Sequence, residues 1–586
     1  MKRAVTMLFI CALIFALFAG CASPSEAPAP EISNSAPPDA STPDPPVDVQ
    51  QDGKESPYNY AAGKYPVNAR GFPTEPYDYA LPLTTEESVF TFWTTTFVNQ
   101  YIPEDGMESL PLQEGMAEKT GVNIEYMIVP WDTRTANFSV MLAAGDLPDL
   151  MACGIDMYPG SSYDAVDEGH FVNIYDYKDY CPNYIYQATF DEEDANTYDS
   201  IFYDDGLIIA FYCLWQEPYY ATNKVVRNDY LQNVGLSAEE LVTWDDWFNA
   251  MHLIKTSIDK VEYPWPLTSA IDVKGSYSTS PSFDTLGFVN SSGLPDIYVK
   301  DGQVTFGNLT ERDKDYMAKL NEFYEAGLID PDWGGYASSA SFADKIGTGQ
   351  IAIMDMAATE IHGYNMNNDD PDCEWTAIAR PLQYEGQVLH VGGDLKRVNG
   401  GSTSISATCE NIELAVSWCD YRYSTEGSFY NSYGPQGVVW DYDENGNIRA
   451  TDWALNHEMG FAWVCTLYAL NNIFEHGLED TDRKTIYEGG EIILETRAFW
   501  GDYDYDGAYE FPTGVRLSQE DTDAVNDLAS DIQTYIAENY SMFLTGDKPF
   551  SEWDTYVDGV FAMDMQTIID IYQQAYDCLL YTSRCV

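Results

Sequence analysis

The chain has 586 residues, of which 94 are acidic and 29 basic, so its formal net charge is −65. This charge excludes nucleic acid as a natural partner and disfavours anionic lipid headgroups, because both require positive charge on the protein. The length exceeds what one ordinary hydrophobic core supports and predicts at least two lobes.

The first 20 residues have the composition of a secretory signal. A basic start is followed by an apolar run at residues 4–19, then by Gly20 and Cys21. This order is typical of a signal peptide rather than of a membrane span. The sequence Ala-Gly-Cys resembles the lipobox of bacterial lipoproteins, although Phe18 stands where that motif usually has leucine. The resemblance implies that Cys21 carries a lipid anchor and becomes the new N-terminus.

A flexible spacer is predicted after Cys21. Residues 22–57 contain no aromatic residue, and eight prolines lie between positions 24 and 46. Such a segment buries too little apolar surface to offset the entropy of ordering. Aromatic residues become frequent from Tyr58, so the packed body is expected to begin between Tyr58 and Glu87. We therefore assign residues 21–86 to the spacer.

Strand and helix patterns alternate in the next part of the chain. Three apolar segments predict strands: residues 89–94, 122–129 and 149–153. Two helices are expected between them, at residues 108–119 and 132–144, each ended by a glycine. This order is typical of a parallel sheet, whose ligands bind beyond the carboxyl ends of the strands. One rim is therefore expected to comprise residues 94–97, 130–131 and 154–158.

The alternation resumes further along the chain and predicts a second α/β lobe. Strands are expected at residues 207–213 and 349–354. Helices are expected at residues 224–234, from the capping box Thr243-Trp-Asp-Asp246 to about Ile258, and at 313–326 and 410–421.

Several short motifs, taken in order, resemble the extracellular solute-binding proteins of ABC importers, in particular the sugar-binding cluster with its LipO-like branch. The motifs are Ala143–Asp149, Tyr220–Lys224, Tyr324–Pro331, Gly347–Met354, Ser404–Ser406, Glu413–Val416, Ser424–Gly427 and Tyr433–Val438. Gln436 departs from the branch, which more often has glutamate there. The resemblance covers residues 88 to 440.

The resemblance implies a fold and a set of domain boundaries. The fold is α/β, of the two-lobed periplasmic-binding-protein type II, with a hinge and an interlobe cleft. The first lobe is expected to comprise residues 87–213 and 388–437, and the second residues 214–387 and 438–577. Residues 578–586 resemble a translated sequencing adapter and are expected not to be natural.

A sugar site needs aromatic platforms and polar acceptors. Together with the strand-end rule, the resemblance implies ligand-binding roles for Trp93, Thr95, Asp156, Tyr158, Trp215, Gln216, Asp355 and Trp440. The implied function is capture of a carbohydrate or oligosaccharide at the outer face of the bacterial cytoplasmic membrane. The implied partners are the solute, the permease subunits of an ABC transporter and, through the lipid, the membrane. A monomer without a cofactor is expected.

Two acidic loops have part of the spacing of a calcium-binding EF-hand loop. In the first, Asp441 to Asp452, an arginine stands at the ninth position, and the Asn-Gly pair favours a β-hairpin turn. In the second, which contains Asp502, Asp504 and Asp506, the twelfth position is Thr513, so the bidentate acid is missing. We expect no metal at either loop, and calcium at the second is the alternative.

Two other classes of function stay open at this point. A secreted glycoside hydrolase needs two carboxylates across a cleft, which 94 acidic residues could supply in many combinations. A surface adhesin would bind glycan without transporting it. The sequence contains no serine-hydrolase, zinc-protease or nucleotide-binding motif, so we expect a binding protein rather than an enzyme.

Overall fold

The computed structural model describes residues 56–584 apart from a set of short gaps. The gaps are residues 97–98, 131–132, 161, 192–193, 204–205, 219, 221, 268–282, 284–296, 308, 337–338, 367, 369, 393–395, 470–473, 481–482, 487–489, 513–514 and 516. The signal peptide, Cys21 and the spacer up to residue 55 therefore lie outside the described residues. Residues 56–586 form one compact unit.

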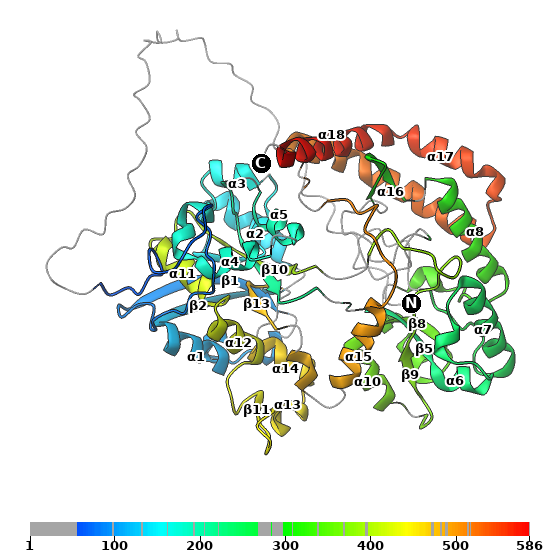
Figure 1. Cartoon of the computed structure of the whole chain (residues 1–586), viewed down its shortest axis with the longest axis horizontal. Helices are drawn as coiled ribbons and strands as arrows, with labels where there is room; N and C mark the ends of the chain where they lie inside the picture. The colour runs from blue at the N-terminus through cyan, green and yellow to red at the C-terminus, as the bar shows by residue number, and fades with distance from the viewer. Residues whose placement is uncertain are drawn as a thin grey trace, which may run out of the picture. The chain divides into compact units, whose positions relative to one another are not determined.

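A six-stranded sheet forms the first lobe, with the strand order β13-β4-β10-β3-β1-β2. The strands are β1 (Ser88–Thr96), β2 (Val122–Pro130), β3 (Leu150–Ala152), β4 (Phe211–Trp215), β10 (Val398–Ile405) and β13 (Gly477–Glu479). β1 runs parallel to both β2 and β3, which confirms the predicted β-α-β-α-β arrangement. β10 is antiparallel to β3 and β4, so one sheet unites segments coloured from blue to orange in Figure 1.

The first two long helices of this lobe end where the sequence predicts. Gly121 and Gly145 both adopt the left-handed conformation, with φ of 74° and 66°. Glycine takes this conformation without the steric cost of a Cβ atom, so both helices end there. The N-cap of the second helix is Thr133, and residue 132, where we expected this helix to begin, lies outside the described residues. The helices of the lobe are α1 (Pro111–Thr120), α2 (Arg134–Ala144), α3 (Ser162–Asp167), α4 (Pro182–Thr189), α5 (Ala195–Ile201), α11 (Ile412–Tyr421) and α12 (Thr425–Tyr433).

The segment from residue 56 to residue 86 is packed against the first lobe. Phe72 and Leu83 are buried in the same core as Phe92 of β1. The Tyr79 hydroxyl donates a hydrogen bond of 2.8 Å to the Asp420 carboxylate on α11. The assignment of residues 21–86 to the spacer is therefore corrected, because the apolar side chains of residues 56–86 complete a core.

Part of the chain after residue 438 also belongs with the first lobe. β13 pairs in parallel with β4. Val439, Trp440 and Val464 pack in a core that includes Met107 and Leu110. The lobe boundary expected at residue 438 is corrected accordingly, since strand pairing and burial join this region to the first sheet. Its elements are β11 (Trp440–Tyr442), β12 (Ile448–Ala450), α13 (Asp452–Leu455) and α14 (Phe461–Tyr468).

A three-stranded antiparallel sheet, in the order β8-β5-β9, forms the second lobe. The strands are β5 (Thr222–Arg227), β8 (Ile353–Ala357) and β9 (Trp375–Ala377). We predicted a helix over residues 224–234, but α6 (Asn228–Asn233) begins only after β5 ends. Val225 and Val226 are β-branched and fully buried, so packing within the sheet outweighs the helical pattern.

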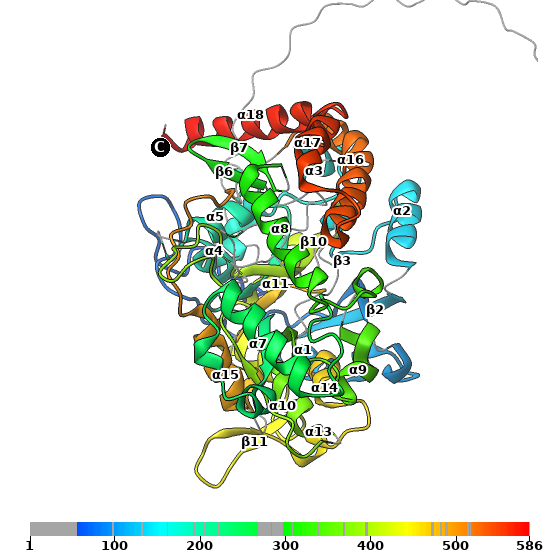
Figure 2. The same cartoon turned by 90° about the vertical axis from the view of Figure 1, so that its right-hand side faces the viewer.

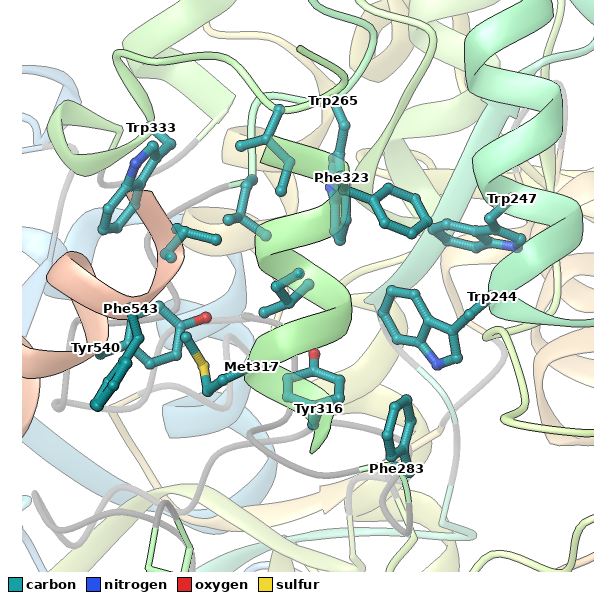
Figure 3. Packing of buried hydrophobic residues seen from close by; sticks show 14 of the residues in the cluster. Trp244, Trp247, Trp265, Phe283, Tyr316, Met317, Phe323, Trp333, Tyr540 and Phe543 are labelled. Atoms are coloured by element: carbon teal, nitrogen blue, oxygen red, sulfur yellow. The ribbon is translucent and has the colours of Figure 1, made fainter. Parts of the chain in front are cut away.

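The second lobe has an aromatic core between its two main helices, α7 (Trp244–Ser257) and α8 (Glu311–Glu325). The predicted capping box of α7 is present, with Thr243 and Asp246 bonded to each other's backbone. Trp244, Trp265 and Phe323 lie together in Figure 3 and have ring centroids about 6 Å apart. Such edge-to-face and tilted contacts add to the stabilisation that burial provides.

Helices from the end of the chain extend this core. α16 (Gln519–Thr545) contributes Tyr540 and Phe543 to the same cluster (Figure 3), and α17 (Trp553–Phe561) and α18 (Met565–Arg584) follow it. Figure 2 shows α16 beside α8, and α18 near the hairpin of β6 (Ile297–Lys300) and β7 (Gln303–Phe306). The remaining helices are α9 (Ala343–Gly347), α10 (Ala358–Met366) and α15 (Gly490–Gly501). None of the helices within the described residues combines the length and apolarity that a bilayer crossing needs.

Candidate functional site

Asp156 is an exposed acidic residue at the carboxyl edge of the first sheet. It lies in a short 3-10 turn, Ile155–Met157, directly after β3. Its carboxylate accepts a hydrogen bond of 3.1 Å from Ser402 Oγ of β10. The side chain is exposed to solvent, yet the surrounding protein disfavours its charged form and raises its pKa.

Tyr158 lies on the same rim, but its hydroxyl is already engaged. It donates a hydrogen bond of 2.8 Å to Glu168, and its ring lies against His170 and Phe171. Burial of the ring and the adjacent carboxylate raise the pKa of Tyr158 to about 12. The hydroxyl is therefore a neutral donor throughout the physiological pH range.

Trp215 and Gln216 lie at the end of β4, at the same edge of the sheet as Asp156. The two edges coincide because β3 and β4 both pair with β10 in the antiparallel sense. The Trp215 side chain is 7% exposed, whereas Gln216 is exposed. The amide of Gln216 is therefore accessible, and the indole of Trp215 presents only a small part of its surface.

Two predicted residues of β1 are buried in this structure. Trp93 is 1% exposed and packs with Phe138 and Met151 in a small core. Thr95 donates its hydroxyl to the Val129 carbonyl at 2.8 Å. The structure does not bring either side chain to the accessible rim with Asp156, and their predicted contact with ligand stays a prediction.

The other two predicted residues lie elsewhere. Asp355 of β8 forms an ion pair of 2.5 Å with the buried Lys224 of β5, in the second lobe. Burial lowers the pKa of Lys224, and the attraction of Asp355 opposes this shift. Trp440 is 4% exposed and donates its indole N–H to the Gly434 carbonyl at 2.8 Å. Trp440 is thus a core residue of the region around α13 and α14.

The first acidic loop forms the predicted hairpin. β11 and β12 pair in the antiparallel sense, and Gly446 occupies the turn with a positive φ. The Asp443 carboxylate accepts hydrogen bonds of 2.8 Å from the backbone N–H groups of Asn445 and Asn447. Its oxygens are therefore used to shape the turn.

The second acidic loop contacts two of the chain segments that connect the lobes. Asp506 lies 2.8 Å from His390 Nδ1, on the segment that leads to β10. The Tyr503 and Tyr220 hydroxyls share a short hydrogen bond, and Tyr220 lies on the segment between β4 and β5. Over the part of the chain that the structure describes, no group of three or more acidic, histidine or cysteine side chains could hold a metal ion.

Three residues at these sites were missed from the sequence: Ser402, Lys224 and Arg397. Lys224 stands in the Tyr220–Lys224 motif, so its position could have been singled out. Ser402 and Arg397 are brought to the site only by the pairing of β10, more than 180 residues from the strands that they meet. No local pattern in the sequence records such pairings.

Comparison with known proteins finds a family whose sequence pattern this chain matches. The family described as bacterial extracellular solute-binding protein matches residues 108–428, which is more than half of the chain. The fructooligosaccharide ABC transporter substrate-binding protein FusA of Streptococcus pneumoniae serotype 4 is 22% identical over 551 residues. That match covers 85% of this chain and 93% of FusA.

Solved structures are similar in fold. The alginate-binding protein AlgQ2 has a TM-score of 0.61 at 18% identity, covering 84% of this chain and 99% of its own. An HMO-binding solute-binding protein of Bifidobacterium longum infantis has a TM-score of 0.66 at 16% identity, with the same coverage. FusA of S. pneumoniae in complex with kestose has a TM-score of 0.60 at 18% identity, covering 84% and 100%. The fold is therefore the periplasmic-binding-protein type II fold that the sequence predicts.

Proposed function

Because the chain belongs to the bacterial extracellular solute-binding proteins, we propose that it captures a carbohydrate, in particular an oligosaccharide, and delivers it to the permease of an ABC transporter. In this proposal a lipid on Cys21 anchors the protein as a monomer to the outer face of the cytoplasmic membrane. The predicted spacer after Cys21 gives the tethered protein reach, because about 34 flexible residues span about 35 Å on a random-coil estimate.

The observation that carries the proposal is the accessible Asp156 carboxylate, with the exposed Gln216 at the same edge of the sheet. Carboxylate and amide groups provide the acceptors and donors that sugar hydroxyls need. The names of relatives give further support. FusA is named for fructooligosaccharides, and proteins of similar fold are named for alginate and HMO binding.

The proposed mechanism is a shift between open and closed forms. A ligand held by both lobes stabilises the closed form because only there does it contact both. The closed form is then the shape that the permease recognises. In this proposal Asp355, which is paired with Lys224, contributes a polar group from the second lobe.

A thermal-shift screen tests the carbohydrate assignment. Kestose is the first probe, followed by alginate and milk oligosaccharides, uronates and peptides. A saccharide present at 100 times its dissociation constant should stabilise the native state by about 2.7 kcal/mol. Stabilisation by peptides and by none of the saccharides would contradict the assignment.

The two rival functions are separated by different measurements. A glycoside hydrolase would cleave the bound oligosaccharide, so chromatography of the sugar after long incubation should find it intact if the proposal holds. An adhesin would bind the sugar without serving uptake. Loss of uptake of the labelled sugar in a deletion strain, restored by the full-length gene, is the result expected for a transport protein.

A further inference from the structure

Arg397 is a buried arginine beside the end of β4, where the chain leaves the first sheet towards the second lobe. It precedes β10 by one residue, and 6% of its side chain is exposed. The Trp215 N–H donates a hydrogen bond of 2.8 Å to the Arg397 carbonyl, so the two backbones are paired at this point. We propose that Arg397 is a positioning residue that fixes Trp215 and Gln216 for ligand binding. The proposal rests on the proposed function.

The guanidinium of Arg397 bonds to the backbone on both sides of the exit. Arg397 Nε lies 3.1 Å from the Trp215 carbonyl oxygen and 3.2 Å from that of Gln216. These two carbonyls belong to the last residue of β4 and the first residue beyond it. A single N–H group thereby holds the backbone on either side of the point at which the strand ends.

The other end of the guanidinium is held by the helices beside the sheet. Nη1 donates to the Gln187 carbonyl at 3.0 Å and lies 3.3 Å from the Asp194 carboxylate. Nη2 donates to Gln187 Oε1 at 2.8 Å. The guanidinium also lies 4.9 Å from the ring centre of Phe190. Arg397 therefore joins α4 and the N-cap of α5 to the end of β4.

The residue type matters because these acceptors surround one planar group. Arginine presents five N–H donors in a rigid fork, whereas lysine presents a compact ammonium that cannot reach acceptors on opposite sides at once. The indole of Trp215 and the amide of Gln216 are side chains of the two residues whose backbone carbonyls Arg397 holds. Replacement by lysine keeps the charge but releases that backbone, so the two side chains lose their fixed directions.

A matched control exists in the second lobe. Arg227 is also fully buried and bonds to Asp229 at 2.7 and 2.6 Å and to Asp370 at 3.2 Å. It ends β5, in the other sheet. Arg227→Lys therefore disturbs a buried, hydrogen-bonded guanidinium without touching the end of β4.

The test is ¹⁹F NMR of the free full-length protein labelled with 5-fluorotryptophan. The Trp215→Phe variant assigns the resonance of Trp215. Arg397→Lys should shift or split that resonance, and Arg227→Lys should leave it unchanged. If Arg397→Lys does not fold, Gln187→Leu removes one acceptor and should give a smaller change in the same resonance. An unchanged Trp215 resonance in the folded Arg397 variant, or in Gln187→Leu where the Arg397 variant does not fold, overturns the proposal.

Calorimetric titration with kestose links the positioning to binding. Arg397→Lys should weaken binding about tenfold, which corresponds to about 1.4 kcal/mol, while Arg227→Lys should stay within about twofold of the wild type. Equal weakening by both variants would mean a general loss of stability and would overturn the inference. Unchanged kestose affinity in Trp215→Phe, with a displaced resonance in Arg397→Lys, would instead contradict the ligand role of Trp215 in the proposed function.

Discussion

Replacement of Asp156 by asparagine should change stability and binding in opposite directions. The surrounding protein raises the pKa of Asp156, and hydrogen bonds from Ser402 and Cys153 lower it in part. Since the folded pKa lies above the unfolded one, near 4, the stability linked to this group is present at low pH and is lost as pH rises through the folded pKa. A neutral asparagine has no such loss, so at pH 7 Asp156→Asn should unfold at the wild-type temperature or above it.

Binding should weaken in the same variant. Asparagine keeps the shape of Asp156 and one acceptor oxygen, but it cannot form the charge-assisted hydrogen bond to a sugar hydroxyl. Such a bond contributes about 1.5–3 kcal/mol, which is a loss of about 10- to 150-fold in affinity. Wild-type affinity should also fall as pH drops through the pKa of Asp156, whereas the affinity of the variant should not follow that titration.

The assay combines calorimetric titration with kestose at pH 5 and 7.5 and melting curves of the free proteins. Ser402→Ala is the control, because it removes a hydrogen bond that lowers the pKa of Asp156 and should move the pH midpoint of binding upward. Wild-type affinity of Asp156→Asn at both pH values would place the ligand elsewhere. A melting temperature several degrees lower would mean that Asp156 has a structural role.

Three further predictions concern other parts of the chain. Trp215 is nearly buried, so Trp215→Ala should lower the free energy of unfolding by about 3–5 kcal/mol in urea titration; a loss below 1 kcal/mol would contradict its burial. Burial raises the pKa of Asp420 to about 7, so wild-type stability should fall relative to Asp420→Asn as pH rises from about 4 to about 7, and parallel pH curves would refute this. Truncation after Asp577 should leave the melting temperature unchanged, because the described core contacts of α18 lie between residues 565 and 576; a drop of several degrees would mean that the end of the chain packs.

The parts of the fold that could be predicted from sequence are those set by neighbouring residues. Gly121 and Gly145 end helices because a left-handed residue is needed at each position, and that need is local. The capping box at Thr243 likewise depends on residues three positions apart. The parallel strands β1, β2 and β3 follow one another along the chain, so their order could be derived as well.

The errors arise where tertiary packing decides. Residues 224–227 carry a pattern that fits a helix, but burial between two strands makes them part of β5. Gly477–Glu479 is too short to be recognised as a strand, yet its pairing with β4 moves the lobe boundary. The burial of Trp93 is likewise set by its neighbours in the folded chain, and its predicted contact with ligand stays a prediction. Residue type and spacing do not determine which face of an element is covered.

The acidic loop at residues 502–506 illustrates the same limit at a functional position. Its spacing suggests a cation site, whereas in the structure Asp506 pairs with His390, and Tyr503 meets Tyr220. The partners are 116 and 283 residues away along the chain. Because the two partners lie on two of the segments that join the lobes, the loop connects both of these segments to the chain that follows α15. A change in these contacts therefore alters the connection between the lobes, which is the part of the molecule that must bend if ligand closes them.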